Sequence, residues 1–367
     1  MAGNRHIAWI DDARTITMLL VIVGHCTYTK IVTNYGGIDY FADITYDEYS
    51  IAAKLLNALV GLIYMFYMPL FMMLSGACFG LTIGKVSDRS SLVKNKSKRL
   101  LVPFLFTTFL LVLPLKYIGG YYSDSTNVLS DMFMGQVLLL GNSHLWFIAS
   151  LFWIFLFYFV LYKIGLARQK YFLLLLVVPT LVGTYLVNKG IEFLGLVGAI
   201  KHLLYFAIGF KCLEKINVTC WGGRKILIHS VLYIFFFYLF GKYGYDKSLV
   251  MKLIHCLLLI VMGLYGSMIM IQISKKVGLL KVIVNNGIYK TFSHYSYELY
   301  LFSDPFNYVL LYLMYVWMGA YVADNMGSIL SFLIRFCGTI CFAFIVIVIK
   351  ASVYKICKGV YVKICKS

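Results

Sequence analysis

The stretch from Ser328 to Ile349 reads SILSFLIRFCGTICFAFIVIVI, and Arg335 is its only charged residue. A helix needs about 20 mostly apolar residues to cross the hydrocarbon core of a bilayer, so this stretch is long enough to span one. Similar runs recur along the chain, which is 61% hydrophobic and only 13% charged. Soluble domains have roughly a quarter charged residues. The sequence therefore predicts an integral membrane protein with many helices.

Ten apolar runs are candidates for transmembrane helices, with short connections between them. No internal repeat or linker separates them, which predicts one domain over residues 1–367. The expected fold class is an all-α polytopic integral membrane protein of about ten transmembrane helices. The expected spans are 14–32, 55–81, 100–118, 145–162, 171–187, 199–213, 226–240, 253–273, 291–317 and 328–349.

Lysine and arginine residues are concentrated in alternate connections, whereas acidic residues favour the others. Cytoplasmic loops close to membrane helices collect basic residues. The basic segments include 85–99, 275–290 and 350–367, and the acidic ones include 39–48. We therefore expect an even number of spans, both termini in the cytoplasm and a short basic cytoplasmic tail at 350–367. The net charge of +18 then reports topology, and we expect the lipid bilayer, not nucleic acid, as a partner.

The sequence holds no pattern typical of a resident cofactor. The nine cysteines show no paired spacing, and no two histidines have the spacing of metal ligands. Neither a Walker loop nor a dinucleotide fingerprint is present. We expect no metal site and no permanently bound cofactor. Because the N-terminal apolar stretch lacks a small-residue cleavage site, we expect the first helix to be retained.

The first expected helix carries three residues suited to chemistry, Asp11, Arg14 and His25. Eleven residues make three turns plus about 20°, which puts Arg14 and His25 on one face about 16 Å apart. Asp11 is within pairing reach of Arg14. Arg14 should lie at the cytoplasmic border and His25 near mid-membrane, where ionisable groups are costly and usually functional. The alternatives are a structural histidine in the core and an ordinary basic anchor.

Five short motifs resemble, in order, those of the membrane acyltransferase-3 family. They cover most of the chain, and each is weak alone. One departure is Ser303, where members commonly have histidine; Asp304 and Pro305 follow it. The motifs are Trp9-Ile-Asp-Asp-Ala-Arg14 with Gly24-His25, Phe66-Tyr-Met-Pro69-Leu-Phe71-Met-Met-Leu-Ser75-Gly76, Lys98-Arg99-Leu-Leu-Val-Pro103, His144-Leu-Trp146-Phe147, and Ser296-Tyr297-Glu-Leu-Tyr300-Leu301-Phe302.

Members of this family move an acyl group, usually acetyl, from cytoplasmic acetyl-CoA to a sugar hydroxyl of a surface glycan or its lipid-linked precursor. The resemblance thus implies a multi-pass O-acetyltransferase of the bacterial cytoplasmic (inner) membrane that modifies an O-antigen, capsule or exopolysaccharide. Acetyl-CoA would be the acyl donor and the glycan the acceptor. Some relatives carry an appended esterase-like domain. We expect none here, so that transfer is completed in the membrane domain or by a partner.

Residue chemistry and the resemblance together assign expected roles on the donor side. A neutral imidazole can accept a hydroxyl proton or carry an acyl group near pH 7, so His25 is the expected base or acyl carrier. Arg14 would hold the phosphate end of the donor, and Asp11 would fix Arg14. Small residues in membrane helices also mark close packing, the interpretation we favour for Ser75-Gly76. The other expected donor-binding residues are Lys98, Arg99 and Ser75, with Lys96 as a further basic group.

The expected acceptor-binding residues are His144, Trp146, Tyr297 and Glu298. Sugars stack on tryptophan and hydrogen-bond to histidine, but aromatic residues at a helix border also anchor the membrane interface. Glu298 and Asp304 are carboxylates inside an expected span, where they are costly unless paired. A structural pair with Arg335 is one explanation. The other places Glu298 on the acceptor path or beside His25.

Two other functions fit the composition. A polytopic transporter or flippase for a lipid-linked sugar would be equally apolar, but the ordered motifs and the lack of an inverted repeat with broken helices argue against it. A glycan polymerase would usually have one long outside loop, and no expected loop exceeds about 30 residues. An O-acetyltransferase is therefore the leading hypothesis.

Overall fold

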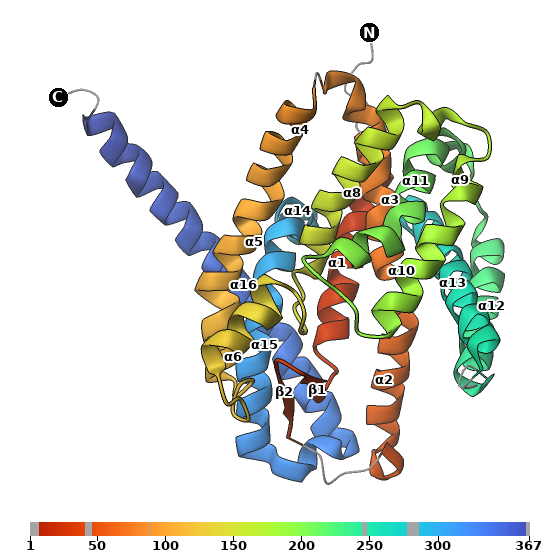
Figure 1. Cartoon of the computed structure of the whole chain (residues 1–367). Coiled ribbons are helices and arrows are strands. Elements are labelled where there is room, and N and C mark those ends of the chain that lie inside the picture. The colour runs from red at the N-terminus through yellow and green to blue at the C-terminus, as the bar shows by residue number, and fades with distance from the viewer. Residues whose placement is uncertain (1–6, 41–45, 87, 244–247, 277–285, 365–367) are drawn as a thin grey trace.

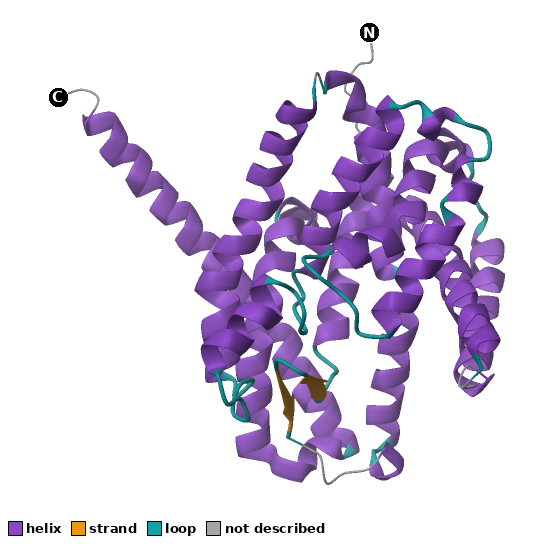
Figure 2. Cartoon of the chain, in the orientation of Figure 1, coloured by secondary structure: helices purple, strands orange, loops and turns teal. Residues whose placement is uncertain are grey.

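The computed structural model describes residues 7–40, 46–86, 88–243, 248–276 and 286–364 of the chain. Helices dominate, and within these ranges the one sheet is the two-stranded hairpin drawn orange in Figure 2. Seven helical segments in these ranges are long and apolar enough to cross a membrane. They are Ile51–Lys85, Arg89–Ile118, Trp146–Lys163, Leu196–Val218, Gly223–Lys242, Val250–Lys276 and Asn325–Ile356. The prediction of a helical, multi-pass membrane protein is confirmed.

Figure 1 shows how the helices and strands are arranged. The helices are α1 (Ala8–His25), α2 (Ile51–Tyr64), α3 (Tyr67–Thr82), α4 (Arg89–Lys96), α5 (Val102–Thr107), α6 (Leu113–Ile118), α7 (Val128–Met132), α8 (Trp146–Lys163), α9 (Phe172–Leu175), α10 (Val177–Asn188), α11 (Leu196–Val218), α12 (Gly223–Tyr243), α13 (Leu249–Lys276), α14 (Asn286–His294), α15 (Ser296–Met318) and α16 (Asn325–Ile364). The strands are β1 (Lys30–Thr33) and β2 (Gly36–Asp39).

Three of the ten expected spans fall outside the seven segments. Helix α1 carries three charged residues among its 18, α9 and α10 form a shorter apolar stretch over Phe172–Asn188, and polar side chains lower the hydropathy of α15. The count of ten therefore stays a prediction. Helix α1 begins and α16 ends at the same end of the molecule (Figure 1), which is the arrangement that an even number of spans requires.

The first expected span, 14–32, is wrong at both ends. Helix α1 begins at Ala8 and ends at His25, and the residues from Lys30 pair antiparallel with β2. Ile31, Val32 and Thr33 are β-branched, and such residues favour extended structure over helix. Gly36 has a φ of +106°, a conformation open mainly to glycine, and so permits the tight turn. This short hairpin is the one sheet within the described residues of an otherwise helical protein.

Helices α3 and α11 cross with their backbones in close contact. A Cβ atom added at Gly76 would lie 2.0 Å from the Phe206 carbonyl oxygen, and one added at Gly209 would lie 1.8 Å from that of Met73. Real Cβ atoms cannot approach so closely, so only glycine permits this crossing. The interpretation of Ser75-Gly76 as a packing motif is therefore correct for Gly76.

The third expected span, 100–118, begins earlier than the sequence pattern indicates. The helix is continuous from Arg89, where Asp88 caps it by accepting a hydrogen bond from the Ser91 amide. A π-helical turn over Ser97–Leu101 precedes α5. Lys98 and Arg99 therefore lie in a widened turn within the helix, not at its start.

We call the end of the molecule where α1 begins and α4 lies the inner end. The opposite end, which carries the β1–β2 hairpin, is the outer end (Figure 1). These names describe only the geometry of the chain.

Candidate active site

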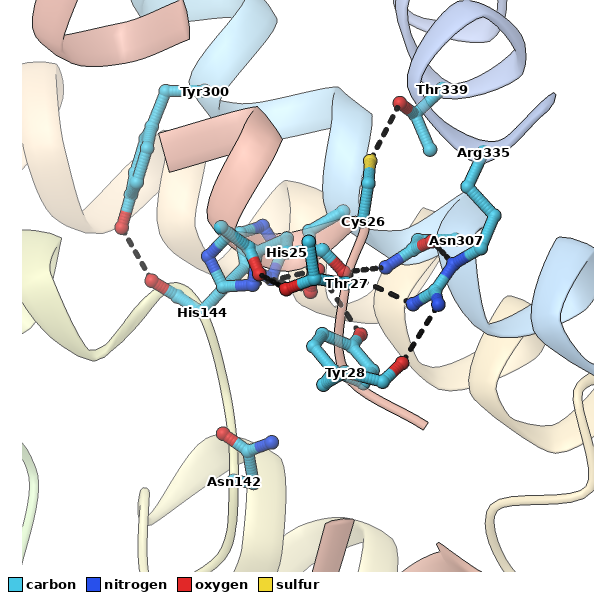
Figure 3. A network of polar contacts seen from close by, with 12 residues as sticks. His25, Cys26, Thr27, Tyr28, Asn142, His144, Tyr300, Asn307, Arg335 and Thr339 are labelled. Atoms are coloured by element: carbon cyan, nitrogen blue, oxygen red, sulfur yellow. Dashed lines mark hydrogen bonds and ion pairs between the residues drawn. The ribbon is translucent and has the colours of Figure 1, made fainter. Parts of the chain in front are cut away.

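His25, Asp304 and His144 meet from three distant parts of the chain. His25 ends α1, Asp304 lies in α15, and His144 lies just before α8. His25 Nδ1 is 3.1 Å from Asp304 Oδ1, and His144 Nδ1 is 3.3 Å from Oδ2. The Asp304 side chain is only 3% exposed. One carboxylate, shielded from solvent, is therefore shared by two imidazoles (Figure 3), whose centroids are 6.4 Å apart and whose planes are 79° apart.

Because both rings contact the same carboxylate, His25 and His144 lie at a similar depth in the membrane domain. The sequence predicts His25 near mid-membrane and His144 at the outer border of its helix, and the two predictions cannot both hold. His144 is also buried, which is unlike a side chain anchoring the membrane interface. It belongs to a polar cluster instead.

The carboxylate orients the His25 ring. Because the Asp304 carboxylate can only accept a hydrogen bond, its position 3.1 Å from Nδ1 favours the neutral His25 tautomer that carries its proton on Nδ1 and leaves the lone pair on Nε2. The His25 side chain is 19% exposed, so the ring is partly open. An imidazole in this state can accept a proton at Nε2, and Asp304 then stabilises the cation that forms.

His144 is held differently. Its Nε2 lies 3.2 Å from the Leu301 carbonyl oxygen, which can only accept a hydrogen bond, so Nε2 carries the proton. Its Nδ1 faces Asp304 without the alignment of a hydrogen bond and has no other partner among the described residues. Tyr300 Oη donates to the His144 carbonyl. The backbone around this ring is thus fixed from α15.

A buried arginine holds the end of α1. Arg335, in α16, is 1% exposed; its Nη1 donates to the Tyr28 carbonyl at 2.7 Å and its Nη2 to the His25 carbonyl at 3.1 Å. Asn307 donates to the same His25 carbonyl at 2.5 Å and accepts from Arg335 Nε at 2.7 Å (Figure 3). The last carbonyls of a helix lack intrahelical partners. Arg335 and Asn307 supply donors to the His25 carbonyl, at the end of α1, and Arg335 also donates to the Tyr28 carbonyl beyond it. These bonds, which we call the Arg335 clamp, fix the backbone of His25.

The expected pair of Arg335 with Glu298 or Asp304 is wrong. Within the described ranges Arg335 forms no ion pair with a carboxylate, and Glu298 Oε1 lies 3.3 Å from Lys350 Nζ instead. Glu298 does not contact His25. The carboxylate beside His25 is Asp304, six residues later in the same helix, because the packing of α15 against α1 selects that position.

A buried lysine holds the loop that carries His144. Lys116 Nζ donates to Gln136 Oε1 at 3.2 Å and to the Asn142 carbonyl. Gln136 donates to the same carbonyl at 3.2 Å. The ammonium also lies 4.1 Å from the centroid of the Tyr121 ring, a favourable cation–π geometry. Asn142, two residues before His144, is thereby tied both to α6 and to Gln136 in the π-helical turn Phe133–Val137.

A cavity of about 250 Å³ lies in the inner half of the molecule. Its basic residues are Arg14, Lys96 and Arg99, and Ser75 and Tyr297 also line it. Arg14 Nη2 is 2.7 Å from Asp11 Oδ1, while Arg14 Nε is buried without a hydrogen-bond partner in the described chain. The cavity therefore offers cationic groups and an unused N–H donor to an anionic or carbonyl-bearing ligand.

The inner cavity approaches the histidine cluster. Phe147 and Tyr300 line the cavity, and their rings lie 5.8 Å apart. Tyr300 also contacts the His144 ring, with 5.9 Å between the centroids. Basic groups at one end and a buried histidine cluster at the other are thus linked by shared wall residues.

The expected site residues are only partly brought together. Arg14, Arg99 and Ser75 share the inner cavity, whereas Lys98 does not line it. Tyr297, expected to bind the acceptor, lines this inner cavity and donates to the Arg99 carbonyl at 3.0 Å. Trp146 lines a second cavity that opens toward the outer end.

Sequence reasoning missed the supporting residues Lys116, Asn307 and Tyr28. Tyr28 Oη donates to Asp304 Oδ1 at 3.4 Å. No spacing rule finds such partners, although a lysine inside an apolar run was a usable signal for Lys116. Tyr64 packs against Gly24, 2.8 Å from where a Cβ atom would stand. In the part of the chain that the structure describes, no group of three His, Cys, Asp or Glu side chains could hold a metal ion.

Comparison with known proteins gives one match. The acyltransferase-3 family model, described as an acyltransferase domain, matches residues 7–348, which is nearly the whole chain. No curated protein and no solved structure matches. The matched region contains the histidine cluster, the Arg335 clamp and both cavities.

Proposed function

Since the chain belongs to the membrane acyltransferase-3 family, we propose that it is an O-acetyltransferase of a bacterial cytoplasmic membrane. It moves the acetyl group of cytoplasmic acetyl-CoA to a sugar hydroxyl of a surface polysaccharide or its lipid-linked precursor. The observation that carries this proposal is the His25–Asp304 pair next to a cavity lined by basic residues. A flippase has no evident use for a carboxylate-oriented imidazole beside such a cavity.

The donor side is the inner cavity. CoA carries phosphates, which arginine binds through paired N–H groups and lysine as a point charge. Arg14, Lys96 and Arg99 provide these cations. The segment Lys85–Arg99 also places many basic residues at the inner end, which supports a cytoplasmic position for that end.

The transfer step uses the lone pair on His25 Nε2. The sugar oxygen attacks the acetyl carbonyl carbon, so that a C–O bond forms and the C–S bond to CoA breaks. His25 Nε2 takes the hydroxyl proton and passes it to the departing sulfur, which yields CoA thiol and the O-acetyl ester. Asp304 stabilises the imidazolium while the proton is on the ring. The same nitrogen could instead carry the acetyl group, and acid-quench trapping of labelled enzyme separates the two routes.

Comparison of the surface glycan with and without the gene tests the proposal. NMR spectra of the purified polysaccharide should lose their O-acetyl signals on deletion while the amount of glycan stays constant. Loss of the glycan itself would instead support a flippase or a polymerase and contradict the proposal. Complementation with the wild-type gene should restore the signals.

A further inference from the structure

A second cavity, of about 420 Å³, opens toward the outer end, within the size range of small-ligand sites. The β1 strand, the loop before α8 and the start of α11 enclose it. Its polar wall includes Asn142, Ser143, Trp146, Glu192 and Lys201. Ser143 and Trp146 lie on either side of His144 in the chain, so this outer cavity approaches the histidine cluster from the side opposite to the inner cavity.

The two charged residues of this cavity, Glu192 and Lys201, are held differently. Glu192 accepts hydrogen bonds from the amides of Phe193, Val197 and Gly198, at 2.9, 3.0 and 2.7 Å. Burial raises the pKa of this carboxyl group above its usual value, while the three amides act in the opposite direction. The lone pairs of Glu192 are thus engaged by the start of α11.

Lys201 has no such partner. It is half-buried, and its ammonium forms no hydrogen bond or ion pair with any residue that the structure describes. Glu192, in the same cavity, attracts this cation but forms no ion pair with it, and a cation withdrawn from water is costly unless it is paired. An anion bound in the cavity would provide a direct partner.

The cavity also has an aromatic wall. The Trp146 ring lies beside His202, with 5.4 Å between centroids and 34° between the planes. His202 Nδ1 is 2.7 Å from the Gly198 carbonyl oxygen, which fixes this ring against the start of α11. An indole held in this way offers a rigid apolar surface against which a sugar ring can pack.

We infer that the outer cavity binds an anionic sugar unit of the acceptor glycan. Its negative group, a carboxylate or a phosphate, pairs with Lys201, and its ring packs on Trp146. This inference rests on the proposed function, because it names the class of acceptor that the transferase takes. It places the acceptor on the opposite side of the histidine cluster from the donor.

Two matched pairs of soluble oligosaccharides test this. The first pair is a glucuronic acid-containing oligosaccharide and its carboxyl-reduced neutral form; the second is a phosphate-bearing oligosaccharide and its dephosphorylated form. Purified full-length protein in liposomes receives labelled acetyl-CoA, and acetylation of each probe is measured as kcat/KM. The wild type should prefer one or both anionic probes by about tenfold or more, which is the low end of the effect of a buried charge pair.

Variants then connect the preference to the cavity. Lys201→Gln should abolish the anionic preference, and Lys201→Arg should keep much of it. Lys189→Gln removes one charge from an exposed position at the end of α10 and should leave the preference intact. Trp146→Ala should lower kcat/KM for both members of a pair, with KM for acetyl-CoA unchanged.

The outcomes separate the inference from the proposed function. If the wild type releases no CoA above the His25→Ala level with any probe, the transferase function itself fails. If the wild type acetylates neutral and anionic probes with equal kcat/KM, or if Lys201→Gln keeps the preference for anionic probes, only the assignment of an anionic acceptor is overturned. Should Lys201→Gln not fold, as judged by size-exclusion chromatography, the wild-type preference and the Trp146→Ala result decide.

Discussion

Replacing Asp304 by asparagine removes a negative charge from between His25 and His144 and leaves the side-chain volume almost unchanged. The amide can donate a hydrogen bond to His25 Nδ1, which would reverse the tautomer and put the proton on Nε2. A protonated Nε2 cannot accept the hydroxyl proton. Asp304→Asn should therefore slow the chemical step and leave donor binding intact.

The distance between the two groups sets the size of the effect. At 3.1 Å, an imidazolium and a carboxylate attract each other by about 5 kcal/mol at an effective dielectric constant of roughly 20. If the whole of this were lost in the transition state, the rate would fall by between 10³- and 10⁴-fold, since about 1.4 kcal/mol corresponds to tenfold. General-base catalysis contributes about 10²- to 10⁴-fold. We expect kcat to fall by about 10²- to 10⁴-fold.

The assay is CoA release from acetyl-CoA by purified protein in liposomes, with an accepting oligosaccharide present. KM for acetyl-CoA should stay within about twofold of the wild-type value, because the inner cavity is unchanged. Ser303→Ala, at the buried neighbouring position in α15, is the matched control and should keep wild-type kcat. If Asp304→Asn folds normally and its kcat is within about threefold of wild type, the role assigned to the carboxylate is refuted.

Three further predictions concern the donor cavity and the packing. Arg14→Gln should raise KM for acetyl-CoA about tenfold or more by removing a phosphate contact, whereas Lys94→Gln, at an exposed position of α4, should not; equal KM values would contradict the donor site. Gly76→Val should prevent α3 from crossing α11 and abolish the monodisperse chromatographic peak, and a normal peak would show that the crossing is not this close. Arg335→Met should destabilise the protein by about 1–3 kcal/mol for each buried carbonyl left without a donor, seen as a lower melting temperature in detergent, and an unchanged melting temperature would contradict the clamp.

Helical periodicity was sufficient to predict the relative positions of residues that lie on the same helix. Arg14 and His25 lie on one helix, and the sequence alone indicated a shared face and the contact between Arg14 and Asp11. Hydropathy likewise located most membrane-length helices. Hydropathy placed the end of the first helix too late, because the apolar residues Ile31 and Val32, which follow His25, suit a strand as well as a helix.

Contacts between distant helices could not be predicted in the same way. Glu298 and Asp304 both lie in α15, and nothing local says which of the two faces His25, which lies 279 residues before Asp304 in the sequence. The register of α15 against α1 is set by packing over the whole interface. The expected carboxylate partner of Arg335 is wrong for a related reason, since Arg335 donates to the Asn307 side chain and to two backbone carbonyls, and backbone acceptors leave no trace in the residue sequence.

We propose that His25 takes part in moving acetyl from acetyl-CoA to a glycan hydroxyl. The most direct measurement follows labelled acetyl from acetyl-CoA into the surface polysaccharide in membranes that contain equal amounts of wild-type or His25→Ala protein. We predict incorporation of base-labile O-acetyl by the wild type and none above background by His25→Ala, with normal insertion of both. Continued O-acetylation by a normally inserted His25→Ala protein would contradict this role for His25.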